Sequence, residues 1–418
     1  MTDSSALGIW AEDSFGVVGL AAYEGAQAPG TTVGTTFDRI DSVLHNSAGQ
    51  TAFRSYARGD SSGRGIWSEG GGSGLRLIAR TRSTHAPGTP TGTQFSSISP
   101  ISFNGAGQTA FSGSLIGSGV IGLNNRGVWS EGSGKGLQLV VRSSNQAPGT
   151  RSGVRFSGFF TDVRINDAGL ASFIGYIRGP GVTGGNDQGI WSEAAGSGVQ
   201  LVVRSRDPAP GAPVGVEFES FENQVINGAG QTAFIGELLG TGVDSTNDRG
   251  LWAQSSGGEL ELVARTGDAA PGTPAGVNFA RLGTYVFNSS GQVAFSGFLT
   301  GTGVDSTNDV GIWALDSSGT LALIAREGDA LDVGNGTAID LRVINDIYFA
   351  GGSGNEDGYQ SGFNETGQLA FTASFTDGTW GAFVSNQVAI PESASVILIS
   401  VMSMVGLFTR HRRFSLEK

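Results

Sequence analysis

The stretch NGAGQTAF at residues 227–234 decides the fold, because its pattern N-x-x-G-x-x-A-F recurs along the 418-residue chain. Complete copies begin at Asn46, Asn104, Asn227, Asn288 and Asn364. A near copy begins at Asn166, where Ser172 replaces the alanine. Successive starts are 58, 62, 61, 61 and 76 residues apart. Self-similarity at such a period indicates a repeat architecture. Six similar units rarely carry one singular catalytic site, so the repeat predicts the shape and leaves the ligand open.

One repeat contains four extended segments. Between Gly189 and Gly250 they lie at 189–193, 199–204, 216–226 and 231–236, with glycine-rich turns between them and no helical periodicity. The repeated asparagine can bond its own backbone two residues on, and the glycine can adopt the left-handed conformation that follows. We therefore interpret the repeated Asn and Gly as turn formers of a hairpin and not as ligands.

The pattern predicts an all-β β-propeller of about six four-stranded blades built from ~61-residue repeats and spanning residues 1–386. Strands such as 321–326 are apolar on both faces, which favours coverage on both sides. Separate tandem domains are the competing architecture, but about sixty residues without a disulfide or metal would be marginally stable. Six tryptophans recur in register and are expected to be buried between sheets, with a sugar-stacking platform as the alternative: Trp10, Trp67, Trp129, Trp191, Trp252 and Trp313.

Composition excludes several classes of function. A net charge of −12 and a pI near 4.7 disfavour nucleic acid as a partner. The chain has no cysteine, which removes disulfides, thiolate chemistry and cysteine-ligated zinc. Its three histidines, His45, His85 and His411, have no second histidine at metal-ligand spacing, so a Ser-His-acid triad would be accidental.

A loop rich in Asn and Asp precedes most of the tryptophans. Closely spaced oxygen atoms in a tight turn suit calcium, and side chains that cap their own turn are the alternative. The candidate calcium ligands are Asp244, Asn247, Asp248, Asp305, Asn308 and Asp309. No other cofactor is expected.

Arginine ends the apolar strand of five repeats: Arg80, Arg142, Arg204, Arg265 and Arg326. In a propeller these residues occupy equivalent points of one face and could line a positive ring for an acidic polysaccharide. The alternative is an ion pair within each blade, such as Arg265 with Asp268.

The composition changes after Asn386. Pro391-Glu392 leads into an uncharged apolar run, residues 394–409, and the basic end at 410–413 contains Arg410, Arg412 and Arg413. Sixteen apolar residues are just short of an ordinary transmembrane helix, and the arginines would hold its C-terminus inside. We treat residues 387–418 as a separate sorting tail with a transmembrane helix.

The tail resembles the PEP-CTERM protein-sorting signal of Gram-negative bacteria, although Ser393 stands where that signal has its second proline. The resemblance implies recognition by an exosortase, transient anchoring in the inner membrane, cleavage near Pro391-Glu392, and delivery to the cell surface or extracellular matrix. The repeats at 8–386 resemble the family named for tandem N-x-x-G-x-x-A-F repeats with interchangeable C-terminal anchors. That family implies no activity.

The N-terminal end differs from that of a typical exported chain, because residues 1–8 have neither a basic nor an apolar signal region. We expect the gene to extend upstream through a signal peptide and another Asn-Gly hairpin, in which case seven blades replace six. As given, the strands around Trp10 are expected to close the ring against the C-terminal ones. The last repeat also carries an insertion that includes residues 351–358, expected to be a surface loop.

The leading functional hypothesis is an exported, non-enzymatic surface or matrix protein that acts in recognition or scaffolding, with exopolysaccharide as a candidate partner. A polysaccharide hydrolase or lyase working at the propeller's centre is one alternative. A calcium-stabilised structural module is the other.

Overall fold

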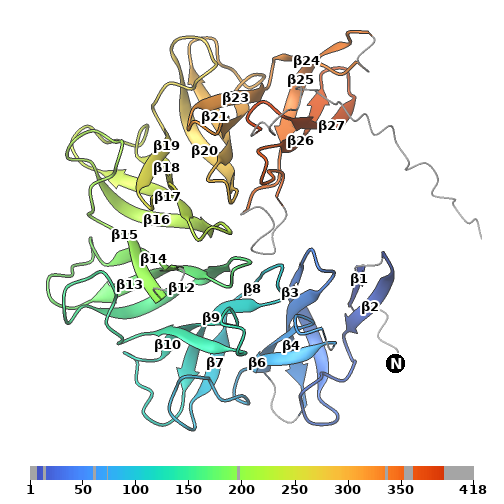
Figure 1. Ribbon diagram of the computed structural model, residues 1–418, viewed down its shortest axis with the longest axis vertical. Coiled ribbons are helices and arrows are strands. Elements are labelled where there is room, and N and C mark those ends of the chain that lie inside the picture. The colour runs from blue at the N-terminus through green and yellow to red at the C-terminus, as the bar shows by residue number, and fades with distance from the viewer. Residues whose placement is uncertain are drawn as a thin grey trace, which may run out of the picture.

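The computed structural model describes residues 7–12, 16–59, 63–72, 74–194, 198–334, 338–352 and 361–389, and within these ranges the chain is all-β. Its strands form antiparallel sheets that follow one another around a common centre, which makes the molecule propeller-like (Figure 1). We call the six larger sheets blades 1 to 6. The expected all-β fold with a propeller-like arrangement of sheets is therefore confirmed.

The blades have the following strands. Blade 1 contains β3 (Thr36–His45), β4 (Thr51–Arg58), β5 (Gly63–Ser68) and β6 (Arg76–Arg80). Blade 2 contains β7 (Gln94–Ile98), β8 (Ser102–Phe103), β9 (Thr109–Ile116), β10 (Arg126–Ser130) and β11 (Gln138–Arg142). Blade 3 contains β12 (Arg155–Ile165), β13 (Ala171–Arg178), β14 (Gln188–Ala194) and β15 (Gly198–Arg204). Blade 4 contains β16 (Glu217–Ile226), β17 (Thr232–Leu239), β18 (Arg249–Gln254) and β19 (Leu260–Arg265). Blade 5 contains β20 (Val277–Phe287), β21 (Val293–Gly301), β22 (Val310–Leu315) and β23 (Leu321–Arg326).

The two ends of the array depart from this plan. Blade 6 has the order β24 (Ala330–Asp332), β25 (Leu341–Tyr348), β26 (Leu369–Phe375) and β27 (Trp380–Ser385). At the other end, β1 (Gly8–Glu12) and β2 (Val18–Tyr23) pair only with each other. Figure 1 shows an opening between blade 6 and this strand pair. The expected closure of the ring by strand pairing between the two ends is therefore not found among the described residues.

An aromatic triplet forms the core of each of blades 1 to 5. In blade 4, the ring of Phe234 stacks on Trp252 with centroids 6.2 Å apart, and Phe218 meets the same indole edge-on at 4.8 Å. The indole N–H donates to the carbonyl of Pro210 at 2.9 Å, which explains the recurrent Ala-Pro-Gly loop. Five of the six repeated tryptophans are fully buried, in agreement with the core-packing interpretation: Trp67, Trp129, Trp191, Trp252 and Trp313.

Glycines make room for the indole. A Cβ atom at Gly250 would lie 2.5 Å from Cη2 of Trp252, and one at Gly236 would lie 3.0 Å from its Cζ3. Gly236 alternates with Phe234 along β17. The physical reason is that the tryptophan ring of the same blade lies across these glycines.

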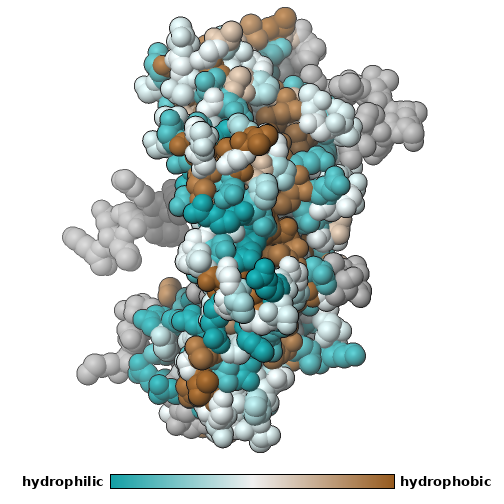
Figure 2. All heavy atoms as spheres, turned by 90° about the vertical axis from the view of Figure 1, so that its left-hand side faces the viewer, coloured by the Kyte–Doolittle hydropathy of each residue, from teal (hydrophilic) through white to brown (hydrophobic). Residues whose placement is uncertain are grey.

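Two expectations about burial are wrong. Trp10 is 64% exposed, because β1 and β2 have no neighbouring strands that supply the two phenylalanines. The apolar strand that ends each repeat is not covered on both sides: in β23, residues Leu321 to Ile324 are only partly buried. This strand is the outermost of its blade, and Figure 2 shows hydrophobic side chains interspersed with hydrophilic ones on the side of the molecule that it views.

The repeated asparagine fastens one blade to the next. Within its own turn, Oδ1 of Asn227 accepts the backbone N–H of Gln231, four residues on, at 2.9 Å. The predicted bond to the residue two positions on is formed by Asn46, whose Oδ1 accepts the N–H of Ala48 at 3.1 Å. Nδ2 of Asn227 donates to the backbone carbonyl of Asn288 in the next blade at 2.8 Å. The same donation runs, each time from Nδ2 to the carbonyl of the following copy, through Asn46, Asn104, Asn166, Asn227, Asn288 and Asn364. We call this series the asparagine ladder.

The last described residues stay attached to the blades. Val388 is buried, and its carbonyl accepts Nε2 of Gln292 in blade 5 at 2.9 Å. The predicted helix at 394–409 and the sorting residues Pro391, Glu392, Arg410, Arg412 and Arg413 lie outside the described residues. Within the described part of the chain, no helix has the length and apolar character needed to cross a membrane.

The insertion in blade 6 begins beside blade 5. Gly352 pairs with Val286 of β20, donating its N–H to the carbonyl of Tyr285 at 3.0 Å and accepting the N–H of Phe287 at 3.1 Å. Residues 353–360 lie outside the description.

Candidate functional site

The Asp-rich loops are organised by their own side chains. Oδ1 of Asp244 accepts both the N–H and the hydroxyl of Thr246, at 2.9 and 2.6 Å, and these bonds hold the pKa of Asp244 below its usual value. Asn247 accepts the N–H of Asp244 at 3.0 Å. Asp305, Thr307 and Asn308 repeat the arrangement. Among the described residues, no group of three or more His, Cys, Asp or Glu side chains could hold a metal ion. Calcium binding by these loops stays a prediction.

Strand-end arginines bind the same loops through hydrogen bonds to backbone carbonyls. Nε of Arg265 donates to the carbonyl of Asn247 at 2.8 Å, and Arg326 binds Asn308 in the same way. Arg142 and Arg204 make equivalent bonds to the loops of blades 2 and 3. Arg80, Arg265 and Arg326 are more than nine-tenths buried. The structure therefore brings the two predicted sets, arginines and Asn-rich loops, together within each of these blades. A ligand role for the arginine ring stays a prediction.

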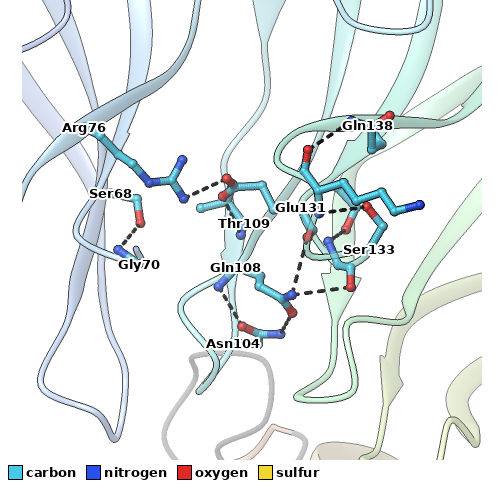
Figure 3. Close-up of polar contacts among 12 residues, drawn as sticks. Ser68, Gly70, Arg76, Asn104, Gln108, Thr109, Glu131, Ser133 and Gln138 are labelled. Carbon is cyan, nitrogen blue, oxygen red and sulfur yellow. Dashed lines mark hydrogen bonds and ion pairs between the residues drawn. The ribbon is translucent and has the colours of Figure 1, made fainter. Parts of the chain in front are cut away.

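The junction between blades 1 and 2 is fastened by charge as well as by the asparagine ladder. Arg76 from β6 forms an ion pair with the buried carboxylate of Glu131, which follows β10, at 2.8 Å (Figure 3). The other oxygen of Glu131 accepts the Thr109 hydroxyl at 2.7 Å. Asn46 and Asn104 join the same two blades at 3.0 Å. These bonds hold the two sheets in a fixed relation.

A cavity of about 380 Å³ lies at this junction, and three arginines line it together with serine hydroxyls. Its lining comes from both blades: Arg54, Arg64, Ser97, Ile98, Ser99, Pro100, Ser112, Gly113, Ser114 and Arg126. Ser97 and Ile98 end β7, and Ser99 and Pro100 belong to the break between β7 and β8. We call this cavity the arginine pocket.

The charge of the arginine pocket is only partly neutralised. Asp41 accepts Nε of Arg54 at 2.5 Å and lies 3.6 Å from Nη2 of Arg64. Arg54 also donates to the carbonyl of Ile98 across the junction at 3.4 Å, so it is held in place. Three guanidinium groups and one carboxylate sum to +2 (3 − 1). An arginine fork is suited to bind a carboxylate or phosphate through two hydrogen bonds.

A second polar cluster lies between blades 5 and 6. Glu327 directly follows β23, at a position where the other blades carry Thr81, Ser143, Ser205 or Thr266. Burial, together with the nearby carboxylates of Asp309 and Asp346, raises the pKa of Glu327 to about 7. Glu327 lines a cavity of about 490 Å³ with Arg326, Asp329 and Asn345. A carboxyl group with such a pKa can donate a proton near neutral pH.

The sequence is also informative when compared with known families. The model of one family matches residues 1–397. The chain belongs to DUF7453, a family of unknown function. No curated protein matches this DUF7453 chain.

Several solved structures match this DUF7453 chain over most of its length, at low identity and low TM-score. A periplasmic gluconolactonase of Pseudomonas aeruginosa is 14% identical, with a TM-score of 0.30 over 90% of this chain and 94% of that one. An α-L-arabinofuranosidase of Fusarium graminearum is 10% identical, with a TM-score of 0.29 over 86% and 99%. A protein from Lactobacillus plantarum is 12% identical, with a TM-score of 0.34 over 94% and 95%. At these identities and TM-scores the likeness carries no information about activity.

Sequence reasoning on this DUF7453 chain missed the arginine pocket and Glu327, because both depend on differences between copies. A signal was present. The position three residues before the buried tryptophan differs between blades. In blades 1 to 5 it is occupied by Arg64, Arg126, Gln188, Arg249 and Val310. Arginine therefore stands there in the adjacent blades 1 and 2. Glu327 likewise stands out when the residues after the strand-end arginines are compared.

Proposed function

We propose that this chain is an exported, non-enzymatic recognition or scaffold protein of the cell surface or extracellular matrix, with acidic exopolysaccharide as its partner. The arginine pocket carries the proposal. Its lining offers guanidinium and hydroxyl groups, which bind anions and sugars, and the carboxylate of Asp41 beside it is engaged in ion pairs with Arg54 and Arg64. Such a lining favours binding over bond cleavage.

The repeated residues support a scaffold role because they are used for cohesion. The tryptophans fill the blade cores, the asparagines form the ladder between blades, and the arginines hold the loops. We infer an array of six blades, with β1 and β2 as the outer half of a seventh. A rigid frame of this kind presents loops and junctions for recognition, and the places where its copies differ are the places for a ligand.

The proposed localisation rests on the C-terminal tail. We infer that residues 387–418 act as a PEP-CTERM-like signal, with a transmembrane helix at 394–409 and an arginine stop, read by an exosortase in the inner membrane. Support comes from the Pro391-Glu392 pair and the basic end alone. The similarity of the repeats to the N-x-x-G-x-x-A-F family, whose members carry interchangeable anchors, agrees with this localisation.

Two measurements test the proposal. The full chain, tagged and placed behind an export signal peptide in an exosortase-bearing Gram-negative host, should reach the surface or medium. Replacing Arg410, Arg412 and Arg413 by alanine should reduce this delivery. The purified chain on a glycan array should bind acidic polysaccharides and leave neutral ones unbound. Unchanged delivery of the variant would remove the sorting role, and an array without any bound glycan would remove the recognition role.

A polysaccharide hydrolase or lyase is the second candidate, and the observation that favours it is the Glu327 cluster. A protonated Glu327 beside the carboxylates of Asp309 and Asp346 has the acid and base groups that glycoside cleavage requires. Release of reducing ends from acidic polysaccharides by the full chain, abolished by Glu327→Gln, would establish this activity. Absence of release by the unaltered chain would remove it.

A further inference from the structure

We propose that the arginine pocket between blades 1 and 2 binds the carboxylate of an acidic sugar unit, such as a uronate within a polysaccharide. This inference rests on the proposed function, because it names the site and the chemical group through which that recognition occurs. Three features of the pocket carry it: guanidinium groups that are only partly neutralised, serine residues in its lining, and a fixed junction.

The guanidinium groups retain donors for a ligand. Within the part of the chain that the structure describes, the side chain of Arg126 forms no ion pair and no hydrogen bond. Nε of Arg64 is buried without a hydrogen-bond partner. Arg64 is held in position because its guanidinium lies 4.5 Å from the ring centroid of Tyr56. Arg126 is exposed, so its guanidinium donors are open to an arriving carboxylate.

The hydroxyl groups and the size of the cavity point to a sugar in place of a small inorganic anion. Ser112 and Ser114 from β9 line the same cavity as the arginines, and so does Ser97 of the neighbouring strand β7, which pairs with Ser114. A volume of about 380 Å³ is in the range of sites that hold small organic ligands. Carboxylate recognition by arginine combined with hydroxyl recognition by serine matches a uronate, which carries both groups on one ring.

Two other places in the array differ from this junction. In blade 4, Arg249 occupies the position of Arg64 and Arg126 but forms ion pairs with Glu222 and Glu237. At the junction of blades 5 and 6, a cavity of about 270 Å³ is lined by Arg281, Val310 and Asp346, among others, so it has one arginine and a carboxylate in its wall. Within the described residues, neither place repeats the set of three arginines that lines the arginine pocket.

The junction is pre-organised. The Arg76–Glu131 ion pair, the bond from Asn46 to Asn104 and the contact from Arg54 to Ile98 hold the two walls of the pocket together. A ligand therefore meets a site whose residues are already placed, which reduces the ordering cost of binding. The overall charge of −12 opposes distant attraction of an acidic polymer, so the local arginines must provide the selectivity.

Titration calorimetry on the full chain tests the inference, with trigalacturonate as the ligand and its methyl ester as the neutral match. The variants are Arg126→Gln and Arg64→Gln, which replace the charged guanidinium by a shorter, neutral amide. Arg58→Gln is the control, because Arg58 lies on β4 in the same blade but is exposed and pairs with Asp38 outside the pocket. Circular dichroism melts confirm that each variant is folded.

The expected result is binding of trigalacturonate, at least about tenfold weaker in Arg126→Gln and Arg64→Gln and unchanged in Arg58→Gln. The methyl ester should not bind. Equal binding by all variants would overturn the assignment of the pocket while leaving glycan recognition intact. Competition by inorganic phosphate at the same concentration would overturn the sugar assignment. If no acidic glycan binds the chain either on the array or in the calorimeter, the proposed function itself is overturned.

Discussion

The asparagine ladder makes a sharp prediction for Asn227→Asp, a change that keeps the shape of the side chain. Asn227 is fully buried. Its Nδ2 donates to the carbonyl of Asn288 and to Oε1 of Gln231, both at 2.8 Å, while its Oδ1 accepts the N–H of Gln231. Aspartate retains the last bond and replaces the two donations by contacts between oxygen atoms. Each buried acceptor that loses its donor costs about 1–3 kcal/mol, so the expected loss of unfolding free energy is about 2–6 kcal/mol.

Asn364→Asp is the matched control. Asn364 ends the ladder, is exposed, and donates only to Oε1 of Gln368 in its own turn. It keeps the same Oδ1 bond to the backbone of the turn. Because water can replace the lost donation at an exposed site, the expected loss is below about 1 kcal/mol. The difference between the two variants therefore isolates the bond between blades from the bond within the turn.

Urea unfolding followed by the fluorescence of the buried tryptophans measures both losses. Losses that agree within about 0.5 kcal/mol would refute the reasoning, because they would mean that the ladder bond between blades contributes nothing beyond the turn. The pH dependence gives a second check. The buried carboxyl of Asn227→Asp has its folded pKa raised, since protonation restores a donor toward Asn288. Its penalty should therefore be smaller near pH 4 than at pH 7.

Three further predictions follow from the blade interiors and from the Glu327 cluster. Trp252→Ala should lower the unfolding free energy by roughly 3–5 kcal/mol and Trp10→Ala by less than about 1 kcal/mol, and equal losses in urea unfolding would contradict the packing described. Gly250→Ala should lower the unfolding free energy by about 1–3 kcal/mol, because the new Cβ atom would collide with the indole of Trp252. Gly19→Ala should change it by less than about 0.5 kcal/mol, because no atom lies within 4 Å of the new Cβ. Thermal melts distinguish the two variants. Glu327 has a folded pKa of about 7, above its ordinary value, so its proton stabilises the fold fully below about pH 4.5 and this contribution is lost as the pH rises through 7. Relative to Glu327→Gln, the unaltered chain should lose stability over that range, and parallel pH profiles would argue against the shifted pKa.

The local features of the fold were readable from the sequence because each depends on residues close together in the chain. The turn chemistry of N-x-x-G predicted the bond from Asn46 to the backbone of Ala48, and the extended segments between glycine-rich turns predicted the strands. Burial of Trp252 was expected from its recurrence in register with the repeat. The same reasoning was wrong for Trp10, whose sequence surroundings resemble those of Trp252 but whose blade has only two strands among the described residues.

The candidate site was much less predictable, because it forms between copies. The expected arginine ring and calcium loops were chosen for their recurrence, yet recurrence selected residues that hold each blade together, such as Arg265 on Asn247. Arg54, Arg64 and Arg126 come from three strands of two blades and meet only after those blades pack. Their charge matters because, among the described residues, Asp41 is the one carboxylate that forms ion pairs with them.

The sequence by itself determined the repeating unit, its strands and turns, and the tryptophan core of each sheet, since these follow from backbone conformation and hydrophobic patterning over about sixty residues. The tertiary structure decided the rest. Only the packing of one blade on the next converts the asparagine amide from a spare donor into a bond between blades, and only that packing gathers three arginines around one cavity. Contacts between residues about sixty positions apart depend on how the sheets are placed, and no local pattern specifies that placement.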